Sequence, residues 1–186
     1  MSLTILMGRS GSGKSTIETL LHKKGLKKLV SYTTRKPQVR NGKLEEDGID
    51  YSFISREQFI ELLNSDKLLE YTEYNGNLYG TPLLDEADVY SNNYIAVLDY
   101  NGYRQLKNLY DDLIIGIYFK CSEEVALSRL FKRDGKADLM KSRKETDKLM
   151  SEILDKNSDY TVDTDKSTDE VLQNVLEILS ENNINI

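Results

Sequence analysis

A glycine-rich stretch near the start of the chain, GRSGSGKST, has residue types and a spacing suited to phosphate chemistry. It satisfies the pattern G-x-x-x-x-G-K-[ST], in which glycines let successive backbone N–H groups converge on phosphate oxygens. We expect Lys14 to reach the β- and γ-phosphates as a catalytic cation, and Ser15 to ligate Mg²⁺. The stretch predicts a site for a nucleoside triphosphate, taken as ATP, formed by Gly8, Arg9, Ser10, Gly11, Ser12, Gly13, Lys14, Ser15 and Thr16.

The segments on either side of this loop predict how it is held. LTILMG before it has the pattern of a buried strand, and KSTIETLLHKKG after it has a helical period, which is the context that the motif requires. The apolar runs YIAVLDY and LIIGIYF then alternate with the helical segments NGYRQLKNLYDD and SEEVALSRLFKRDG. This alternation predicts an α/β fold of the P-loop NTPase type, with a parallel five-stranded sheet flanked by helices.

Three pairs of residues predict where helices begin. Ser55 with Gln58, and Ser167 with Glu170, have the spacing of a capping box. Thr81 followed by Pro82 has the pattern of an N-cap residue with proline at the first helical position. Each pair therefore predicts a helix that starts directly after its first residue.

Two segments interrupt the α/β alternation. Residues 31–81 are rich in Tyr and Thr, with short β-like pieces, and predict a small mixed β/α insert; residues 133–154 are a highly charged helical stretch, interpreted as a lid. The remaining segments, 1–30, 82–132 and 155–186, then form the core. A chain of 186 residues fits one domain with these two inserts.

Composition excludes several classes of protein. The formal net charge of −6 argues against binding to nucleic acid, which depends on a basic surface. A secretion leader or an apolar stretch of membrane-spanning length is not evident, so we expect a cytoplasmic protein without a membrane partner, a monomer or homodimer. The single Cys121 ends an apolar run and is expected to be a buried side chain.

The segments SYTTRKP, DYSF and LLEYTEYNGNLYGT, found in this order after the phosphate loop, resemble those of the guanylate kinase family. The resemblance extends over essentially the whole chain, through an apolar strand that ends near Asp99, to an arginine-bearing lid. It implies an enzyme that transfers the γ-phosphoryl group of Mg-ATP to GMP, and also to dGMP, to give ADP and GDP. It also implies that residues 31–81 bind GMP.

The resemblance assigns roles that the chemistry of GMP explains. A guanine edge offers N1–H and N2–H₂ as donors beside the O6 acceptor, so one carboxylate can accept both donors while hydroxyl groups donate to O6. Glu70 takes the carboxylate role, and a planar guanidinium with two phenol groups holds the monophosphate. The GMP-binding residues implied are Ser31, Arg35, Arg40, Tyr51, Glu70, Tyr79, Thr81 and Asp99.

Three arginines follow the strand LIIGIYF and match the family's lid and post-strand arginines. Arg129 and Arg133 are four residues apart on one predicted helix, so they share a face, and Arg143 lies in the charged segment that follows. With Lys14 they are the predicted catalytic residues, because phosphoryl transfer depends mainly on alignment and on cations that neutralise the shared charge. The alternative is that this charged stretch is an ordinary solvated helix face.

The chain departs from the family pattern at two positions. The second arginine that usually contacts the monophosphate is replaced by Gln38, and we expect Arg40, two residues later, to take its role. Val97 stands where the family often has a further acidic residue, so Asp99 could serve either the guanine amino group or the Mg²⁺ shell. Two other functions remain open: a kinase with another acceptor, such as ribose bisphosphate or a different nucleoside monophosphate, or a non-catalytic guanylate-kinase-like binding module.

Overall fold

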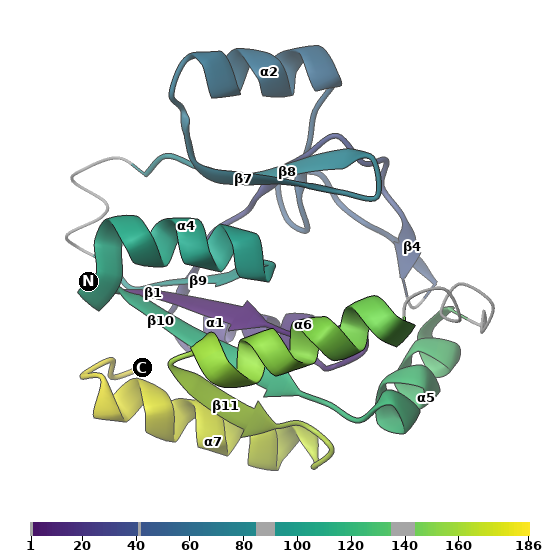
Figure 1. The fold of residues 1–186 in the computed structure, drawn as a ribbon, viewed down its shortest axis with the longest axis vertical. Helices are drawn as coiled ribbons and strands as arrows, with labels where there is room; N and C mark the ends of the chain where they lie inside the picture. Colours follow the sequence, from purple (N-terminus) through teal and green to yellow (C-terminus); the bar gives the residue numbers. More distant parts are fainter. Residues whose placement is uncertain (1, 41, 85–91, 135–143) are drawn as a thin grey trace.

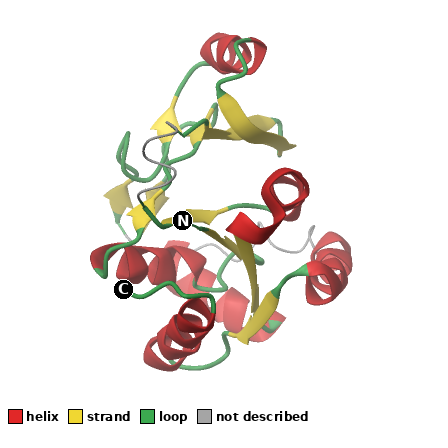
Figure 2. Cartoon of the chain, turned by 90° about the vertical axis from the view of Figure 1, so that its left-hand side faces the viewer, coloured by secondary structure: helices red, strands yellow, loops and turns green. Residues whose placement is uncertain are grey.

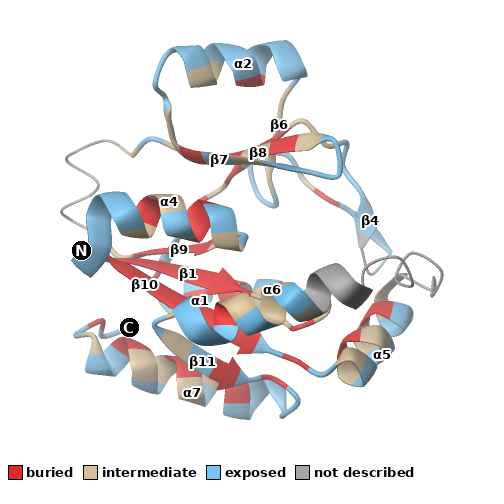
Figure 3. Ribbon diagram, viewed as in Figure 1, coloured by how far each residue is buried: buried red, intermediate tan, exposed pale blue. Residues whose placement is uncertain are grey.

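A computed structural model describes residues 2–40, 42–84, 92–134 and 144–186. Its main sheet has five parallel strands in the order β11-β10-β1-β9-β2, which confirms the predicted sheet. The strands are β1 (Leu3–Met7), β2 (Lys27–Lys28), β9 (Tyr94–Val97), β10 (Ile114–Lys120) and β11 (Tyr160–Asp163). The central strand β1 is buried along its whole length because both faces of the sheet are covered by helices, as Figure 3 shows.

Alternate residues of β1 enter two separate apolar clusters. Leu6 packs in the cluster formed with α1 and α7, whereas Leu3 and Ile5 pack in the cluster formed with α4 and α6. The helices are α1 (Lys14–Lys23), α4 (Tyr100–Tyr110), α5 (Glu123–Asp134), α6 (Lys144–Asn157) and α7 (Thr168–Glu181). A one-turn 3₁₀ helix, η1 (Asp111–Leu113), connects α4 to β10. Figure 1 shows the helices arranged around the sheet in this way.

A second, smaller sheet lies within the predicted insert. Its strand order is β6-β3-β8-β7, and β3 pairs parallel with β6 while the other pairs are antiparallel. The elements are β3 (Tyr32–Thr33), β6 (Ser52–Phe53), α2 (Arg56–Asn64), β7 (Leu68–Tyr74) and β8 (Asn77–Pro82). Figure 2 shows this sheet between α2 and the core layers. Phe59 of α2 is fully buried against Gly80 of β8, where an added Cβ would lie 2.9 Å from the Phe59 ring.

A short hairpin extends from this insert beside the core. It consists of β4 (Val39–Arg40) and β5 (Lys43–Leu44), which pair antiparallel. Strand β4 contacts α5, so the hairpin connects the insert to the helix that carries Arg129 and Arg133. Figure 1 shows β4 and α5 on the same side of the molecule.

Two of the three predicted helix starts are confirmed. Ser55 and Ser167 each accept a hydrogen bond from the backbone of the residue three positions later, in complete capping boxes that begin α2 and α7. The prediction at Thr81 and Pro82 is wrong, because both residues belong to β8. There, pairing with β7 outweighs the local capping pattern, and Pro82 is tolerated as the last residue of the strand.

The bounds of the helices and strands can be compared with the predicted core, insert and lid. Strands β3 to β7 lie inside residues 31–81 and β8 ends one residue beyond them at Pro82, while the predicted lid boundary at residue 154 falls inside α6. Leu154 is buried in the core cluster, so the C-terminal part of α6 packs on the main sheet. The subdivision into core, insert and lid stays a prediction.

Candidate active site

The loop between β1 and α1 is shaped by three glycines with positive φ. Gly8, Gly11 and Gly13 have φ values of 141°, 84° and 92°. A Cβ at Gly8 would lie 2.7 Å from the Phe119 carbonyl oxygen, and one at Gly11 would lie 2.6 Å from the Ala126 carbonyl oxygen. The glycines are therefore needed both for the backbone conformation and for close packing against β10 and α5.

Lys14 begins α1 and its side chain folds back over this loop. Its Nζ donates to the carbonyl oxygens of Gly8 and Arg9, at 2.6 and 2.8 Å. Gly13, at the N-cap of α1, offers no side-chain acceptor to the first amides of the helix. The helix N-terminus and the ammonium group thus create a positive site suited to phosphate oxygens. Ser15 and Thr16 lie exposed in the first turn, while Ser10 is exposed and Ser12 buried in the loop.

Of the three predicted arginines, Arg129 is the best defined. Its Nη2 donates to the carbonyl oxygens of Thr164 and Lys166, at 2.7 and 3.3 Å, and its Nη1 lies 3.9 Å from where a Cβ of Gly13 would be. Arg129 therefore lies between the phosphate loop and the segment after β11, to which it is hydrogen-bonded. Arg133 lies one turn later on α5 and is half-buried, and Arg143 lies outside the described residues.

Glu70 and Thr81 face each other across the β7–β8 hairpin. They are paired in the strand register, and the Thr81 hydroxyl donates to Glu70 Oε1 at 2.5 Å. Both side chains are buried, Glu70 with 5% and Thr81 with 0% exposure. Ser31, which precedes β3, is also buried in the same sheet region, and its carbonyl oxygen accepts from the Ser52 amide.

Asp99 lies beside Glu70 at the start of α4. Its Oδ1 caps the helix by accepting from the Gly102 amide at 2.9 Å, and its Oδ2 accepts from the Thr72 hydroxyl of β7 at 3.0 Å. An added Cβ at Gly102 would lie 2.7 Å from Glu70 Oε2 and 3.6 Å from Asp99 Oδ1. The two carboxylates thus converge on Gly102, and the geometry groups Asp99 with Glu70.

The environment of Glu70 changes its acidity. Burial raises the pKa of Glu70 to about 7, the hydrogen bond from Thr81 opposes this rise, and the nearby charge of Asp99 adds to it. A group near its pKa at neutral pH can exist in either form, so donors that favour the carboxylate can shift it to the ionised form. Such a carboxylate suits a ligand edge that offers two N–H donors.

Arg35 lies among aromatic rings at the other end of the small sheet. Its guanidinium carbon is 5.2 Å from the centre of the Tyr51 ring and 5.8 Å from that of Phe53, and the rings of Tyr51 and Tyr79 are 6.0 Å apart. Arg35 also forms an ion pair of 2.8 Å with Glu45. The structure thus brings the predicted phosphate contacts Arg35, Tyr51 and Tyr79 together. Arg40 lies in β4 opposite Lys43.

Three residues near these groups were not predicted from the sequence. Glu45 contacts Arg35, Thr72 donates to Asp99, and Gly102 leaves room for the Glu70 carboxylate. The spacing of Asp99 and Gly102 is that of an N-cap and its third helical residue, so the capping pattern could have indicated Gly102. The contacts of Glu45 and Thr72 depend on tertiary pairing, which local sequence does not reveal.

The described residues include neither a grouped set of metal-ligating side chains nor a membrane-spanning helix. Within them, no three His, Cys, Asp or Glu side chains are grouped so that they could hold a metal ion. Among the described helices, none combines the length and apolar character needed to span a membrane.

The parallel sheet, the phosphate loop and the second sheet with its acidic cluster define a P-loop α/β protein of the nucleotide-kinase type. A sequence model described as guanylate kinase matches residues 1–182. The chain therefore belongs to the guanylate kinase family, which confirms the resemblance stated from the motifs.

Individual relatives support this assignment. The guanylate kinase of Ehrlichia canis is 34% identical over 148 residues, which cover 76% of this chain and 68% of that protein. The guanylate kinase of Mycoplasma genitalium is 32% identical over 182 residues, which cover 94% of this chain and 73% of that protein. For the guanylate kinase of Mycoplasma mycoides, the match spans 55% of the relative's length.

Solved structures show the same fold. The guanylate kinase from Anaplasma phagocytophilum has a TM-score of 0.75 and 21% sequence identity, over 100% of this chain and 87% of that one. The shikimate kinase from Aquifex aeolicus has a TM-score of 0.51 and 16% identity, over 99% of each chain. Since kinases named for different acceptors share this core, the fold alone does not identify the acceptor, which depends on the residues of the site.

Proposed function

We propose that this protein transfers the γ-phosphoryl group of Mg-ATP to GMP, giving ADP and GDP, and that it also accepts dGMP. The observation that carries the proposal is the buried pair of Glu70 and Thr81 beside Asp99. This group offers carboxylate acceptors for N1–H and N2–H₂ of guanine and a hydroxyl for O6. Family membership supports the same acceptor.

The phosphate of the acceptor is held at the other end of the small sheet. Arg35 supplies paired charge-assisted hydrogen bonds, and the phenol groups of Tyr51 and Tyr79 complete the oxygen shell. Arg40 substitutes for the arginine that is replaced by Gln38. In this arrangement the same part of the protein holds both the base and the phosphate of GMP. The phosphate oxygen that attacks ATP is therefore held in one orientation toward the phosphate loop.

The donor is held by residues 8–16, and Lys14 neutralises charge on the transferring group. Arg129, Arg133 and Arg143 contribute further positive charge near the ATP phosphates. No general base is needed, because the second pKa of a phosphate monoester is about 6 and its oxygen is ionised near neutral pH. The protein therefore acts mainly through alignment, electrostatic neutralisation and exclusion of water.

Mg²⁺ fits the donor set in one limited way. The exposed Ser15 hydroxyl at the first turn of α1 offers a hard oxygen ligand, the kind that this ion prefers. Asp99 accepts from Thr72 of β7 and lies beside the Glu70 carboxylate at Gly102, which supports the guanine role for this residue. The ion would neutralise charge on the ATP phosphates, held by Ser15, those phosphates and water.

A coupled ADP-release assay tests this function. Mg-ATP is supplied with GMP, dGMP, AMP, UMP, dTMP or ribose bisphosphate as the acceptor. Turnover with GMP and dGMP alone is the expected result. Turnover with another acceptor would show that the insert recognises a different molecule, and no turnover with any of them, together with binding of a phosphorylated peptide, would favour a non-catalytic module.

A further inference from the structure

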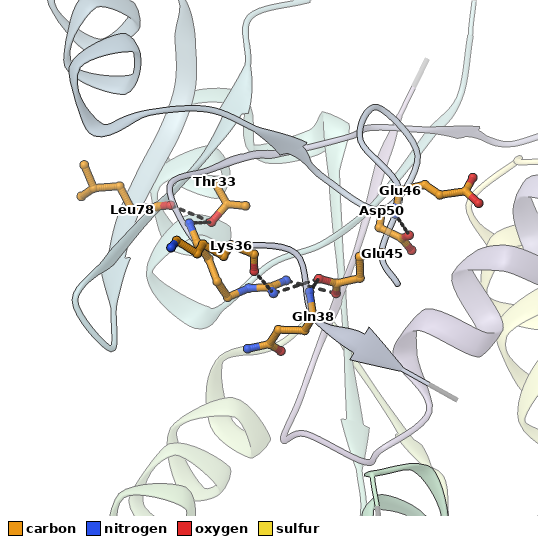
Figure 4. Close-up of polar contacts among 8 residues, drawn as sticks. Thr33, Lys36, Gln38, Glu45, Glu46, Asp50 and Leu78 are labelled. Atoms are coloured by element: carbon orange, nitrogen blue, oxygen red, sulfur yellow. Dashed lines mark hydrogen bonds and ion pairs between the residues drawn. The ribbon is translucent and has the colours of Figure 1, made fainter. Parts of the chain in front are cut away.

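Glu45 is a buried carboxylate that the proposed reaction does not use directly. It directly follows β5, and its side chain is only 4% exposed. Burial of an ionised carboxylate is costly unless charges and hydrogen bonds compensate it, so its partners show what it does. Figure 4 shows the Glu45 carboxylate directed at Gln38. The same carboxylate also contacts the side chain of Arg35.

The first partner is the guanidinium of Arg35. Glu45 Oε2 lies 2.8 Å from Nη1 and Oε1 lies 3.1 Å from Nη2, which is a two-point contact along one end of the guanidinium. Nη1 also donates to the Lys36 carbonyl oxygen at 2.9 Å. The side chain of Arg35 is therefore fixed in one orientation, with 11% exposure.

This contact leaves one edge of Arg35 for a ligand. A guanidinium has five N–H donors, of which Nη1 uses two and Nη2 uses one in the contacts with Glu45 and Lys36. Among the residues that the structure describes, no further acceptor contacts Arg35. The remaining Nε–H and the second Nη2–H lie side by side, in the arrangement that binds two oxygens of one phosphate.

The second partner of Glu45 is the backbone at Gln38. The Gln38 amide donates to Glu45 Oε2 at 2.9 Å, and the Glu45 amide donates to the Gln38 carbonyl oxygen at 3.0 Å. Residues 38 and 45 directly flank the β4–β5 pairs, so these two bonds close the base of the hairpin. One carboxylate thus fixes both Arg35 and the start of the hairpin that carries Arg40.

We propose that Glu45 is a positioning residue for the acceptor phosphate, acting through Arg35 and the base of the β4–β5 hairpin. The inference rests on the proposed GMP kinase function. Gln38 supplies no charge at the monophosphate site, so binding depends on presenting the Arg35 edge in the right direction. Glu45 provides that orientation in advance, which lowers the entropy lost when phosphate binds.

The key variant is Glu45→Gln, which has nearly the same shape. Its carboxamide oxygen can replace Oε2, which contacts both Arg35 Nη1 and the Gln38 amide, but its NH₂ group then faces the donor Arg35 Nη2, and the negative charge is lost. Glu46→Gln is the matched control, because the neighbouring Glu46 pairs with Lys43 at the surface, with side-chain exposures of 45% and 75%. Glu45→Asp keeps the charge and serves as a second variant if Glu45→Gln does not fold.

The experiment measures GMP and ATP binding by calorimetry for the wild type and each variant, alone and in an Arg35→Ala background. We expect Glu45→Gln to weaken GMP binding by about tenfold or more, with ATP binding unchanged, as for loss of a charge-assisted contact. Glu46→Gln should bind GMP like the wild type, and Glu45→Asp should bind it more tightly than Glu45→Gln. In the Arg35→Ala background, Glu45→Gln should cause a clearly smaller loss, because the part of its effect that passes through Arg35 is already gone and only the part through the hairpin remains.

Three results would overturn the inference while leaving the GMP kinase function intact. GMP affinity could fail to fall in Glu45→Gln: an unchanged affinity would mean that Glu45 does not orient Arg35 for phosphate, and an improved one that the carboxylate competes with phosphate. The loss could be equal in the Arg35→Ala background, or could extend to ATP, which would indicate a general structural role. If the wild-type protein does not bind GMP at all, the proposed function fails and the inference fails with it.

Discussion

Glu70 should make recognition of GMP depend on pH near neutrality. Its carboxyl is buried, and burial raises its pKa to about 7. The guanine edge needs the ionised form, because only a carboxylate accepts both N1–H and N2–H₂. The efficiency kcat/KM for GMP should therefore follow the fraction of Glu70 that is ionised in the free enzyme.

The expected size follows from this pKa. A group with a pKa of about 7 is roughly one-tenth ionised at pH 6 and roughly nine-tenths ionised at pH 8. The efficiency for GMP should thus rise about tenfold between these values and then level off. The second ionisation of the GMP phosphate, near pH 6, adds only about a factor of two over the same range.

The assay is the initial rate at low GMP and saturating Mg-ATP, measured from pH 5.5 to 8.5 by ADP release. The control is Glu70→Gln, which should turn over GMP poorly and retain only the weak dependence near pH 6. Refutation would come from a wild-type profile that shows only the roughly twofold rise near pH 6 caused by the GMP phosphate, or from the same midpoint near 7 in Glu70→Gln. Either result would show that a Glu70 pKa of about 7 does not control the turnover of GMP.

The same pKa shift has an opposite consequence for stability. A carboxyl whose pKa in the folded protein is raised above its ordinary value stabilises the fold at low pH, and this contribution is lost as pH rises through about 7. At pH 8 the ionised Glu70 is therefore destabilising, by a few kcal/mol at most on the scale of about 1.4 kcal/mol per pKa unit. Glu70→Gln should raise the melting temperature at pH 8 and change it little at pH 4.5. A larger gain at the lower pH would contradict this sign.

Three further substitutions test the site. Gly102→Ala should raise KM for GMP and leave KM for ATP unchanged, because its Cβ would lie 2.7 Å from Glu70 Oε2; equal effects on both substrates would refute this in steady-state assays. Lys14→Met should lower kcat by about 10²–10³-fold with GMP binding retained, as measured by single-turnover kinetics and calorimetry. Arg40→Ala should weaken GMP binding, and an unchanged affinity would mean that Gln38 is not compensated by this residue.

The parts of the site that lie close together in sequence were predictable from it. The phosphate loop depends on glycine conformations and on a strand and helix that directly flank it, so a short pattern describes it completely. Buried parallel strands likewise have a continuous apolar pattern. The prediction failed at Thr81 and Pro82, where a favourable local capping pattern competed with pairing to β7 and pairing prevailed.

Contacts between distant segments could not be predicted in the same way. Thr72 and Asp99 are 27 positions apart, and their hydrogen bond exists because β7 packs beside the start of α4. The ion pair of Arg35 and Glu45 spans 10 positions, and it forms because the β4–β5 hairpin brings Glu45 back beside Arg35. Such pairs depend on the tertiary arrangement, whereas motif spacing describes only the chain.

Two buried glutamates, Glu45 beside the β4–β5 hairpin and Glu70 in β7, show how the environment gives the same residue type two different roles. Glu45 is paired with a guanidinium, which compensates its charge and turns it into a fixed support for that cation. Glu70 has a hydroxyl partner and a neighbouring carboxylate, and its pKa rises to about 7, so a ligand must supply the donors that favour its ionised form. A support should be insensitive to pH near neutrality, while a recognition group should respond to it. Comparing the pH profiles of Glu45→Gln and Glu70→Gln therefore separates the two roles: the first variant should retain the midpoint near 7, and the second should lose it.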